Sequence, residues 1–132
     1  MIPIRHILCV DDEEDILQVT RLSLETVGGL EVSTCKGGAG ALSLAKQVHP
    51  DLILLDVMMP GMDGPSTFRM LKTDPEIALI PVVFMTAKVQ PSEVSNYIAL
   101  GALGVIPKPF HPMTLSKQVE ALWKTFQGSR HE

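Results

Sequence analysis

The chain has 132 residues, of which 45% are hydrophobic and 20% are charged. A chain of this length forms one domain that buries roughly two-thirds of the surface of its unfolded state. Its formal net charge of −4 and its lack of a basic run argue against direct binding of nucleic acid. No apolar run is long enough to span a membrane, and the N-terminus lacks the apolar region of a signal peptide. We therefore expect a cytoplasmic protein without membrane contact.

The two cysteines agree with that location. Cys9 and Cys35 each lie inside an apolar, strand-like run. A secreted disulfide framework uses more cysteines in a smaller chain. We therefore predict that both residues are reduced, buried thiols.

Short apolar runs predict five β-strands. The run from Leu52 to Leu55 is apolar at every position, as in a strand buried on both faces of a parallel sheet. The run from Leu30 to Cys35 alternates apolar and polar residues, which is typical of a strand nearer the sheet edge. The predicted strands cover residues 7–10, 30–35, 52–55, 80–85 and 104–107.

Five helices are predicted between and after these strands. The first carries acidic residues in its first turn, which suits the helix dipole, and ends at Gly28–Gly29. Pro65 is acceptable at the first position of the third helix. The predicted helices cover residues 13–27, 39–48, 65–71, 91–100 and 112–126. In the first of them the apolar residues that recur at helix-like intervals are Ile16, Leu17, Val19, Leu22, Leu24 and Val27.

Regular alternation of strands and helices indicates βαβ units around a parallel sheet. Right-handed crossovers place the helices on both faces of such a sheet. We therefore predict a doubly wound α/β domain.

Polar residues follow the predicted strands, and the carboxyl ends of parallel strands lie along one edge of the sheet. Those ends carry Asp11 and Asp12, Asp56, Thr86 and Lys108. Two unpaired carboxylates about 4 Å apart repel by roughly 4 kcal/mol at an effective dielectric near 20, and Mg²⁺ relieves such repulsion with oxygen ligands. Lys108 and Thr86 add a cation and a hydroxyl for a small oxyanion beside Asp56. A carboxylate in this setting can act as a nucleophile toward a phosphoryl group.

With these residues at its strand ends, the chain resembles the receiver domain of two-component response regulators, in particular the single-domain chemotaxis type. The resemblance runs from Ile7 to Phe126. The motifs that carry it are Asp11-Asp12, Asp56 with the following Met-Pro-Gly-Met-Asp-Gly, Thr86-Ala87 and Lys108-Pro109-Phe110. It implies a five-stranded parallel sheet of order 2-1-3-4-5, the flavodoxin-like receiver fold.

The resemblance also implies a metal site. Asp12 and Asp56 would bind Mg²⁺ directly, Asp11 would bind it directly or through water, and Met58 would contribute its backbone carbonyl. Mg²⁺ is the expected cofactor.

Further roles follow from the same resemblance. Asp56 would accept a phosphoryl group from a sensor histidine kinase or a phosphotransfer protein. Lys108 would pair with the phosphate and Thr86 would hydrogen-bond one of its oxygens. The Lys108–Pro109 peptide bond would be cis, which X-Pro bonds allow at modest cost. The protein would not be a conventional enzyme, although it would assist its own phosphorylation and dephosphorylation.

The expected domain organisation is a receiver domain at residues 1–127 and a short disordered tail at 128–132. No output domain is expected in this chain. The protein would therefore act through a separate downstream protein.

One position departs from the family pattern. The family often has an aromatic residue three positions before the lysine, and its rotation follows the threonine. Here that position is Val105, whose short side chain cannot swing over a comparable distance. Switching would then use loop movement, the nearby Tyr97, or partner binding.

Three alternative functions compete with a phosphorylation-dependent switch. A receiver-like interaction module would work without phosphorylation, and Val105 is the residue that favours it. A Mg²⁺-dependent aspartyl-phosphate hydrolase usually has a second aspartate two residues after the nucleophile, where this chain has Met58. A flavodoxin-like carrier would need a phosphate-binding loop where the acidic residues 11–14 lie.

Overall fold

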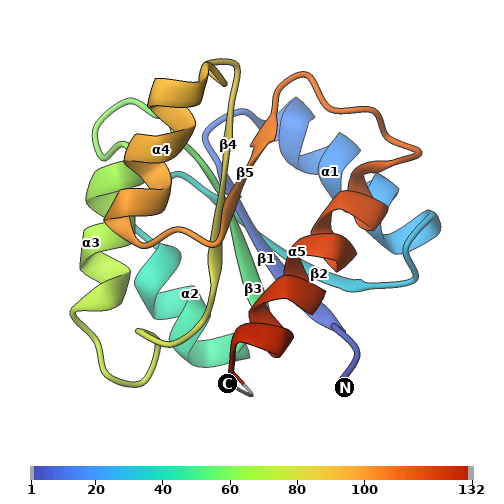
Figure 1. The fold of residues 1–132 in the computed structure, drawn as a ribbon, viewed down its shortest axis with the longest axis horizontal. Helices are drawn as coiled ribbons and strands as arrows, with labels where there is room; N and C mark the ends of the chain where they lie inside the picture. The colour runs from blue at the N-terminus through green and yellow to red at the C-terminus, as the bar shows by residue number, and fades with distance from the viewer. Residues whose placement is uncertain (1, 131–132) are drawn as a thin grey trace.

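A computed structural model describes residues 2–130 and contains one parallel sheet of five strands in the order β2-β1-β3-β4-β5. The chain alternates strand and helix from β1 to α5 (Figure 1). The strands are β1 (His6–Asp11), β2 (Glu31–Lys36), β3 (Leu52–Asp56), β4 (Val82–Thr86) and β5 (Gly104–Pro107). The predicted doubly wound fold and its strand order are confirmed.

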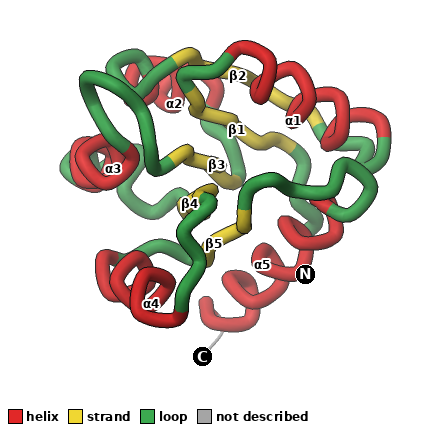
Figure 2. The backbone as a smooth tube through the Cα atoms, turned by 90° about the horizontal axis from the view of Figure 1, so that it is seen from above, coloured by secondary structure: helices red, strands yellow, loops and turns green. Residues whose placement is uncertain are grey.

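Five helices cover the two faces of the sheet within the described residues. They are α1 (Glu14–Thr26), α2 (Ala41–Val48), α3 (Gly64–Lys72), α4 (Pro91–Leu100) and α5 (Leu115–Arg130). Figure 2 shows α1 and α5 on one face and α2, α3 and α4 on the other. Each face of the sheet therefore has its own hydrophobic core.

The position of β3 explains its uninterrupted apolar sequence. It lies between β1 and β4, with Ile7 opposite Leu52 in the parallel register. Successive side chains of a strand point to opposite faces, so Leu52 and Leu54 join the core under α1 and α5, while Ile53 and Leu55 join the other core. A strand covered by helices on both faces needs apolar residues at consecutive positions.

Two element boundaries differ from the prediction by more than the usual uncertainty at the ends of strands and helices. β4 begins at Val82, because Ile80 is held in a turn by a bond from its N–H to the Ile77 carbonyl and Pro81 has no N–H to donate. α5 begins at Leu115 and not at 112, after a turn closed on the His111 carbonyl.

The predicted disordered tail was wrong for its first residues. α5 continues to Arg130, so residues 128–130 are helical. Residues 131 and 132 of the predicted tail lie outside the described residues.

The apolar residues of α1 are divided between core and surface. Leu17 and Leu24 are buried, whereas Val19 and Leu22 are 45% and 65% exposed. Helical spacing alone does not distinguish these two groups, because the width of the buried stripe depends on what the helix packs against.

Both cysteines are free, as predicted, but only Cys9 is buried and Cys35 is partly exposed. Among the described residues, no helix has the length and apolar character needed to cross a membrane.

Candidate functional site at the carboxyl edge of the sheet

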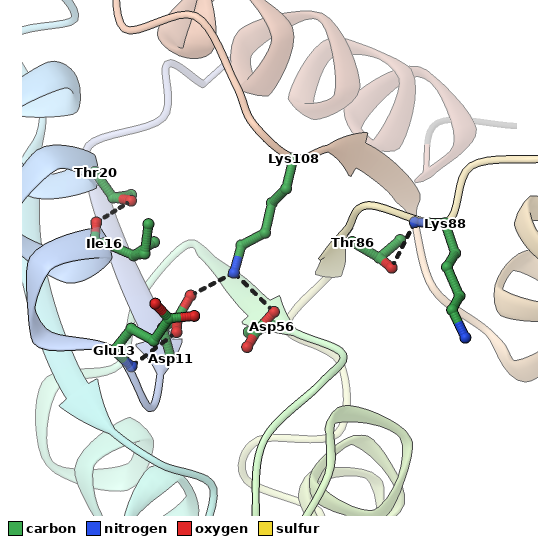
Figure 3. Close-up of polar contacts among 8 residues, drawn as sticks. All are labelled: Asp11, Glu13, Ile16, Thr20, Asp56, Thr86, Lys88 and Lys108. Atoms are coloured by element: carbon green, nitrogen blue, oxygen red, sulfur yellow. Dashed lines mark hydrogen bonds and ion pairs between the residues drawn. The ribbon is translucent and has the colours of Figure 1, made fainter.

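One lysine joins carboxylates from the two central strands. The Lys108 Nζ atom donates to Asp11 Oδ2 and to Asp56 Oδ1, each at 2.9 Å (Figure 3). Asp11 and Asp56 end β1 and β3, which are neighbours in the sheet, and Lys108 directly follows β5. Both carboxylates are only 4% exposed as residues. The parallel sheet therefore brings together three groups that are far apart in the sequence.

Asp12 completes an acidic cluster with Asp11 and Asp56. One ligand oxygen from each of the three carboxylates lies within 4.8 Å of the others. Both oxygens of Asp11 accept a hydrogen bond, since the one not bonded to Lys108 accepts from the Glu13 N–H at 3.0 Å. In contrast, Asp12 Oδ1 is buried and has no hydrogen-bond partner.

The unpaired oxygen of Asp12 is informative. A buried acceptor without a partner costs about 1–3 kcal/mol, and more when it is charged. Three clustered carboxylates offer the oxygen ligands that hard divalent cations prefer. The donor set therefore fits a metal ion, and the orphaned oxygen is where such an ion would remove an existing cost.

The electrostatic balance at Asp56 has opposing contributions. Burial raises the pKa of the Asp56 carboxyl above its ordinary value, and the negative charges of Asp11 and Asp12 raise it further, while the hydrogen bond and charge of Lys108 lower it. Burial also lowers the pKa of Lys108, but its bonds to the two carboxylates outweigh burial and the net shift is upward. Lys108 thus stays charged and partly offsets the free-energy cost of burying the Asp56 carboxylate.

The Thr86 hydroxyl is directed away from this cluster. Thr86 ends β4 and is 1% exposed, and its Oγ1 accepts a hydrogen bond from the Lys88 N–H at 3.0 Å (Figure 3). The structure therefore gathers Asp11, Asp12, Asp56 and Lys108, but Thr86 only lies at the same edge.

Met58 lies two residues beyond Asp56 in the loop that leads to α3. Its side chain is 66% exposed. The Lys108–Pro109 peptide bond is cis, as predicted.

Gly64 is a supporting residue that the sequence analysis did not single out. It begins α3, and an added Cβ would lie 2.5 Å from the backbone oxygen of Asp56 and 2.7 Å from Val57 Cα. The preceding residue, Asp63, caps the helix by accepting from the Ser66 N–H at 2.8 Å. The Asp-Gly pair before a helical run was the available signal.

A sequence profile described as "Response regulator receiver domain" matches residues 7–120, most of the chain. The chain belongs to this receiver family. Residues outside that match include the N-terminal segment and the second half of α5.

Comparison with individual response regulators supports the same family. The receiver is 41% identical over 117 residues to the response regulator PleD of Caulobacter vibrioides, covering 89% of this chain and 26% of that protein. It is 36% identical over 118 residues to the alkaline phosphatase synthesis transcriptional regulatory protein PhoP of Bacillus subtilis, covering 89% of this chain and 48% of that protein. The receiver thus spans about a quarter to a half of the length of these relatives.

A solved structure has the same fold over nearly its whole length. The chemotaxis protein CheY4 of Vibrio cholerae is 31% identical, with a TM-score of 0.82, and the match covers 90% of this chain and 98% of that one. The receiver is therefore similar to a signalling protein of comparable extent, as well as to parts of larger regulators.

Proposed function

We propose that Asp56 accepts a phosphoryl group and that the receiver is switched by this modification. A carboxylate oxygen of Asp56 would attack the phosphorus atom while the bond from phosphorus to the donor breaks, and the donor leaves with the bonding electrons. The observation that carries the proposal is the Lys108 ammonium bonded to Asp56 Oδ1 at 2.9 Å. A cation already placed at this carboxylate offsets the negative charge that a phosphoryl group brings.

Mg²⁺ is the proposed cofactor. Asp12 and Asp56 would hold it, with Asp11 bound directly or through water and the Met58 carbonyl as a further ligand. When bound, Mg²⁺ would neutralise charge on the phosphoryl oxygens and on the clustered carboxylates. The acidic cluster and the unpaired Asp12 oxygen support this assignment.

Thr86 is proposed to bind the phosphoryl group after transfer. A hydroxyl has one donor and two acceptor sites, and in this structure the Thr86 oxygen accepts from the Lys88 N–H. Its O–H can donate to a phosphoryl oxygen once the side chain turns toward Asp56.

The proposed donors are a sensor histidine kinase or a phosphotransfer protein, and the proposed output is binding to a separate downstream protein. These assignments are supported by membership of the response regulator family and by the clustering of three carboxylates with the Lys108 ammonium. We propose that the receiver assists its own phosphorylation and dephosphorylation and has no other substrate.

Labelling with acetyl phosphate tests the proposal. Mg²⁺-dependent addition of one phosphoryl group should be detected by intact mass, and it should be lost in Asp56→Asn. Asp63→Asn is the matched control, because Asp63 is an aspartate of the adjacent loop and asparagine can also cap α3. Undiminished labelling of Asp56→Asn would refute the assignment, and so would equal loss in the Asp63 variant.

A further inference from the structure

Helix α4 is attached to the sheet differently from the neighbouring helices. It has no fully buried residue, whereas α2 and α3 each have at least two. Two of its residues, Tyr97 and Leu100, pack partly buried against the core on its face of the sheet. Leu100 is the last residue of α4, so Tyr97 is the contact nearer its middle. A helix held by few buried groups can move at low cost.

Tyr97 contacts the strand that ends in Thr86. Its ring lies 5.1 Å from the ring of Phe84, centroid to centroid, and Phe84 is fully buried on β4. Side chains two apart in a strand share a face, so Thr86 lies on the same face of β4 as Phe84. Thr86 and Phe84 are therefore on the face of β4 against which Tyr97 packs.

Val105 of β5 lies next to these side chains. It is opposite Phe84 in the β4–β5 register and packs partly buried in the same core as Tyr97. A valine fills less of this face than an aromatic residue would.

The Thr86 hydroxyl also holds the loop that leads to α4. Its bond to the Lys88 N–H at 3.0 Å joins β4 to residues 87–90, all of which are exposed. Asp56 shares the face of Leu54, on the side of α1 and α5. Thr86 must therefore turn away from Lys88, and from the α4 face, to reach a phosphoryl group on Asp56.

We propose that Tyr97 couples the position of Thr86 to that of α4, with its ring moving inward beside Val105 when the Thr86 hydroxyl leaves Lys88. The inference rests on the proposed phosphorylation of Asp56. The movement would free the loop at residues 87–90 and draw the middle of α4 toward the sheet. Tyr97 would be a positioning residue, since it contacts neither Asp56 nor the metal ligands.

The composition of the chain allows a direct test, because it has one tyrosine and one tryptophan. The whole protein labelled with 3-fluorotyrosine gives a single ¹⁹F resonance from Tyr97. Adding Mg²⁺ and beryllofluoride, which mimics a phosphoryl group on a carboxylate, should shift this resonance and reduce its broadening by a soluble paramagnetic agent. The resonance of 5-fluorotryptophan at Trp123, which lies in the other core, should not change.

Two variants separate coupling from simple packing. Val105→Phe keeps a single tyrosine and places a large ring next to Phe84, where it would block inward movement of Tyr97, so the Tyr97 resonance should no longer respond to beryllofluoride. Tyr97→Leu keeps an apolar contact. In this variant, beryllofluoride should no longer change the chemical shifts of the backbone amides in α4, but it should still change those of Asp56 and Thr86.

The possible failures are distinguishable. If amides at Asp56 and Thr86 respond but Tyr97 does not, or if α4 responds equally in Tyr97→Leu, the coupling is refuted and the phosphorylation site stands. If no amide near Asp56 responds to Mg²⁺ and beryllofluoride, the proposed function fails and the coupling fails with it.

Discussion

At the level of single residues, Lys108 reduces the free-energy cost of burying the two carboxylates of the site. It shares one ammonium group between two carboxylates that are each 4% exposed. A buried ion pair adds little net stability by itself, but removing Lys108 would leave two uncompensated carboxylates in the interior. The arrangement keeps the Asp56 carboxylate paired with a cation at the end of an apolar strand.

Asp12 should determine the response of stability to metal. Mg²⁺ at about 100 times its Kd should raise the free energy of unfolding by about 2.7 kcal/mol if it binds only the folded state. Asp12→Asn should lose most of this gain, because it removes the charge of the carboxylate whose buried oxygen has no partner. Thermal unfolding with and without Mg²⁺ checks this, with Asp63→Asn as the control that should respond like the parent chain. An equal gain in Asp12→Asn would contradict the metal assignment.

Asp56 should lower stability at neutral pH in the absence of metal. Burial and the neighbouring carboxylates raise the pKa of Asp56 in the folded state, so the folded chain binds this proton more tightly than the unfolded chain. The resulting cost is present while Asp56 is ionised and disappears as pH falls through the raised pKa. Asp56→Asn should therefore raise the free energy of unfolding at neutral pH in the absence of metal.

Urea unfolding at neutral and acidic pH measures this effect, and the advantage of Asp56→Asn should shrink as the pH falls. Ionised Asp63 should contribute to the free energy of unfolding with the opposite sign, because hydrogen bonds from Ser66 lower the pKa of its carboxyl. Its contribution is favourable above the unfolded pKa and is lost as the pH falls. An Asp56→Asn variant less stable than the parent at neutral pH would contradict the expected sign.

At the scale of elements, the junction between β3 and α3 limits what the site loop can accept. Gly64 lies so close to the end of β3 that a methyl group would overlap backbone atoms of Asp56 and Val57. Neither atom can give way without moving the strand that carries Asp56. The junction therefore links helix position to site geometry.

Two glycine substitutions should have opposite effects for this reason. Gly64→Ala should destabilise by about 1–3 kcal/mol through overpacking, and should also weaken labelling of Asp56. Gly128→Ala in α5 meets no atom within 4 Å and should stabilise by roughly 0.5–1 kcal/mol through helix propensity. Chemical denaturation of both variants measures the contrast. If the two changes had the same sign, local propensity and not the β3–α3 contact would dominate at Gly64.

Periodicity and turn residues predicted the elements because their causes are local. The runs of β1 and β3 end at carboxylates, and Gly101 ends α4 with a positive φ of 117°. The start of β4 and the extent of α5 were less accessible, since they depend on a turn at Ile77–Ile80 and on packing of the last helix. For the same reason the exposure of Val19 and Leu22 could not be deduced from their spacing.

In the molecule as a whole, the sheet separates two hydrophobic cores that connect different elements. The core under α1 and α5 contains Cys9 and Trp123, and the Trp123 Nε1 atom donates to the Ile2 carbonyl at 2.8 Å. This bond ties the N-terminal segment to α5. The other core contains the Phe68–Phe84–Tyr97 series of ring contacts, which leads from α3 to α4.

Cys9 should report unfolding of the entire domain. Burial raises the pKa of its thiol to about 12, and a protonated, buried thiol is unreactive. Cys35 is partly exposed and should be alkylated in the folded protein. In a Cys35→Ser variant, the rate of alkylation of Cys9 should follow the unfolded population across a urea titration. Rapid alkylation of Cys9 without denaturant would show local opening of β1.

Local sequence patterns are sufficient to predict the alternation of strands and helices, the residue types at the strand ends and the resemblance to receiver domains. These depend on hydrophobic period, turn residues and the parallel arrangement, which places all carboxyl ends at one edge. The hydrogen bonds among those groups depend instead on the folded arrangement of the whole chain. Lys108 reaches Asp11 across 97 positions of sequence, Asp12 retains an unpaired oxygen, and the Thr86 hydroxyl turns to Lys88. Such details depend on side-chain rotamers and burial set by distant segments, which no local pattern in the sequence records.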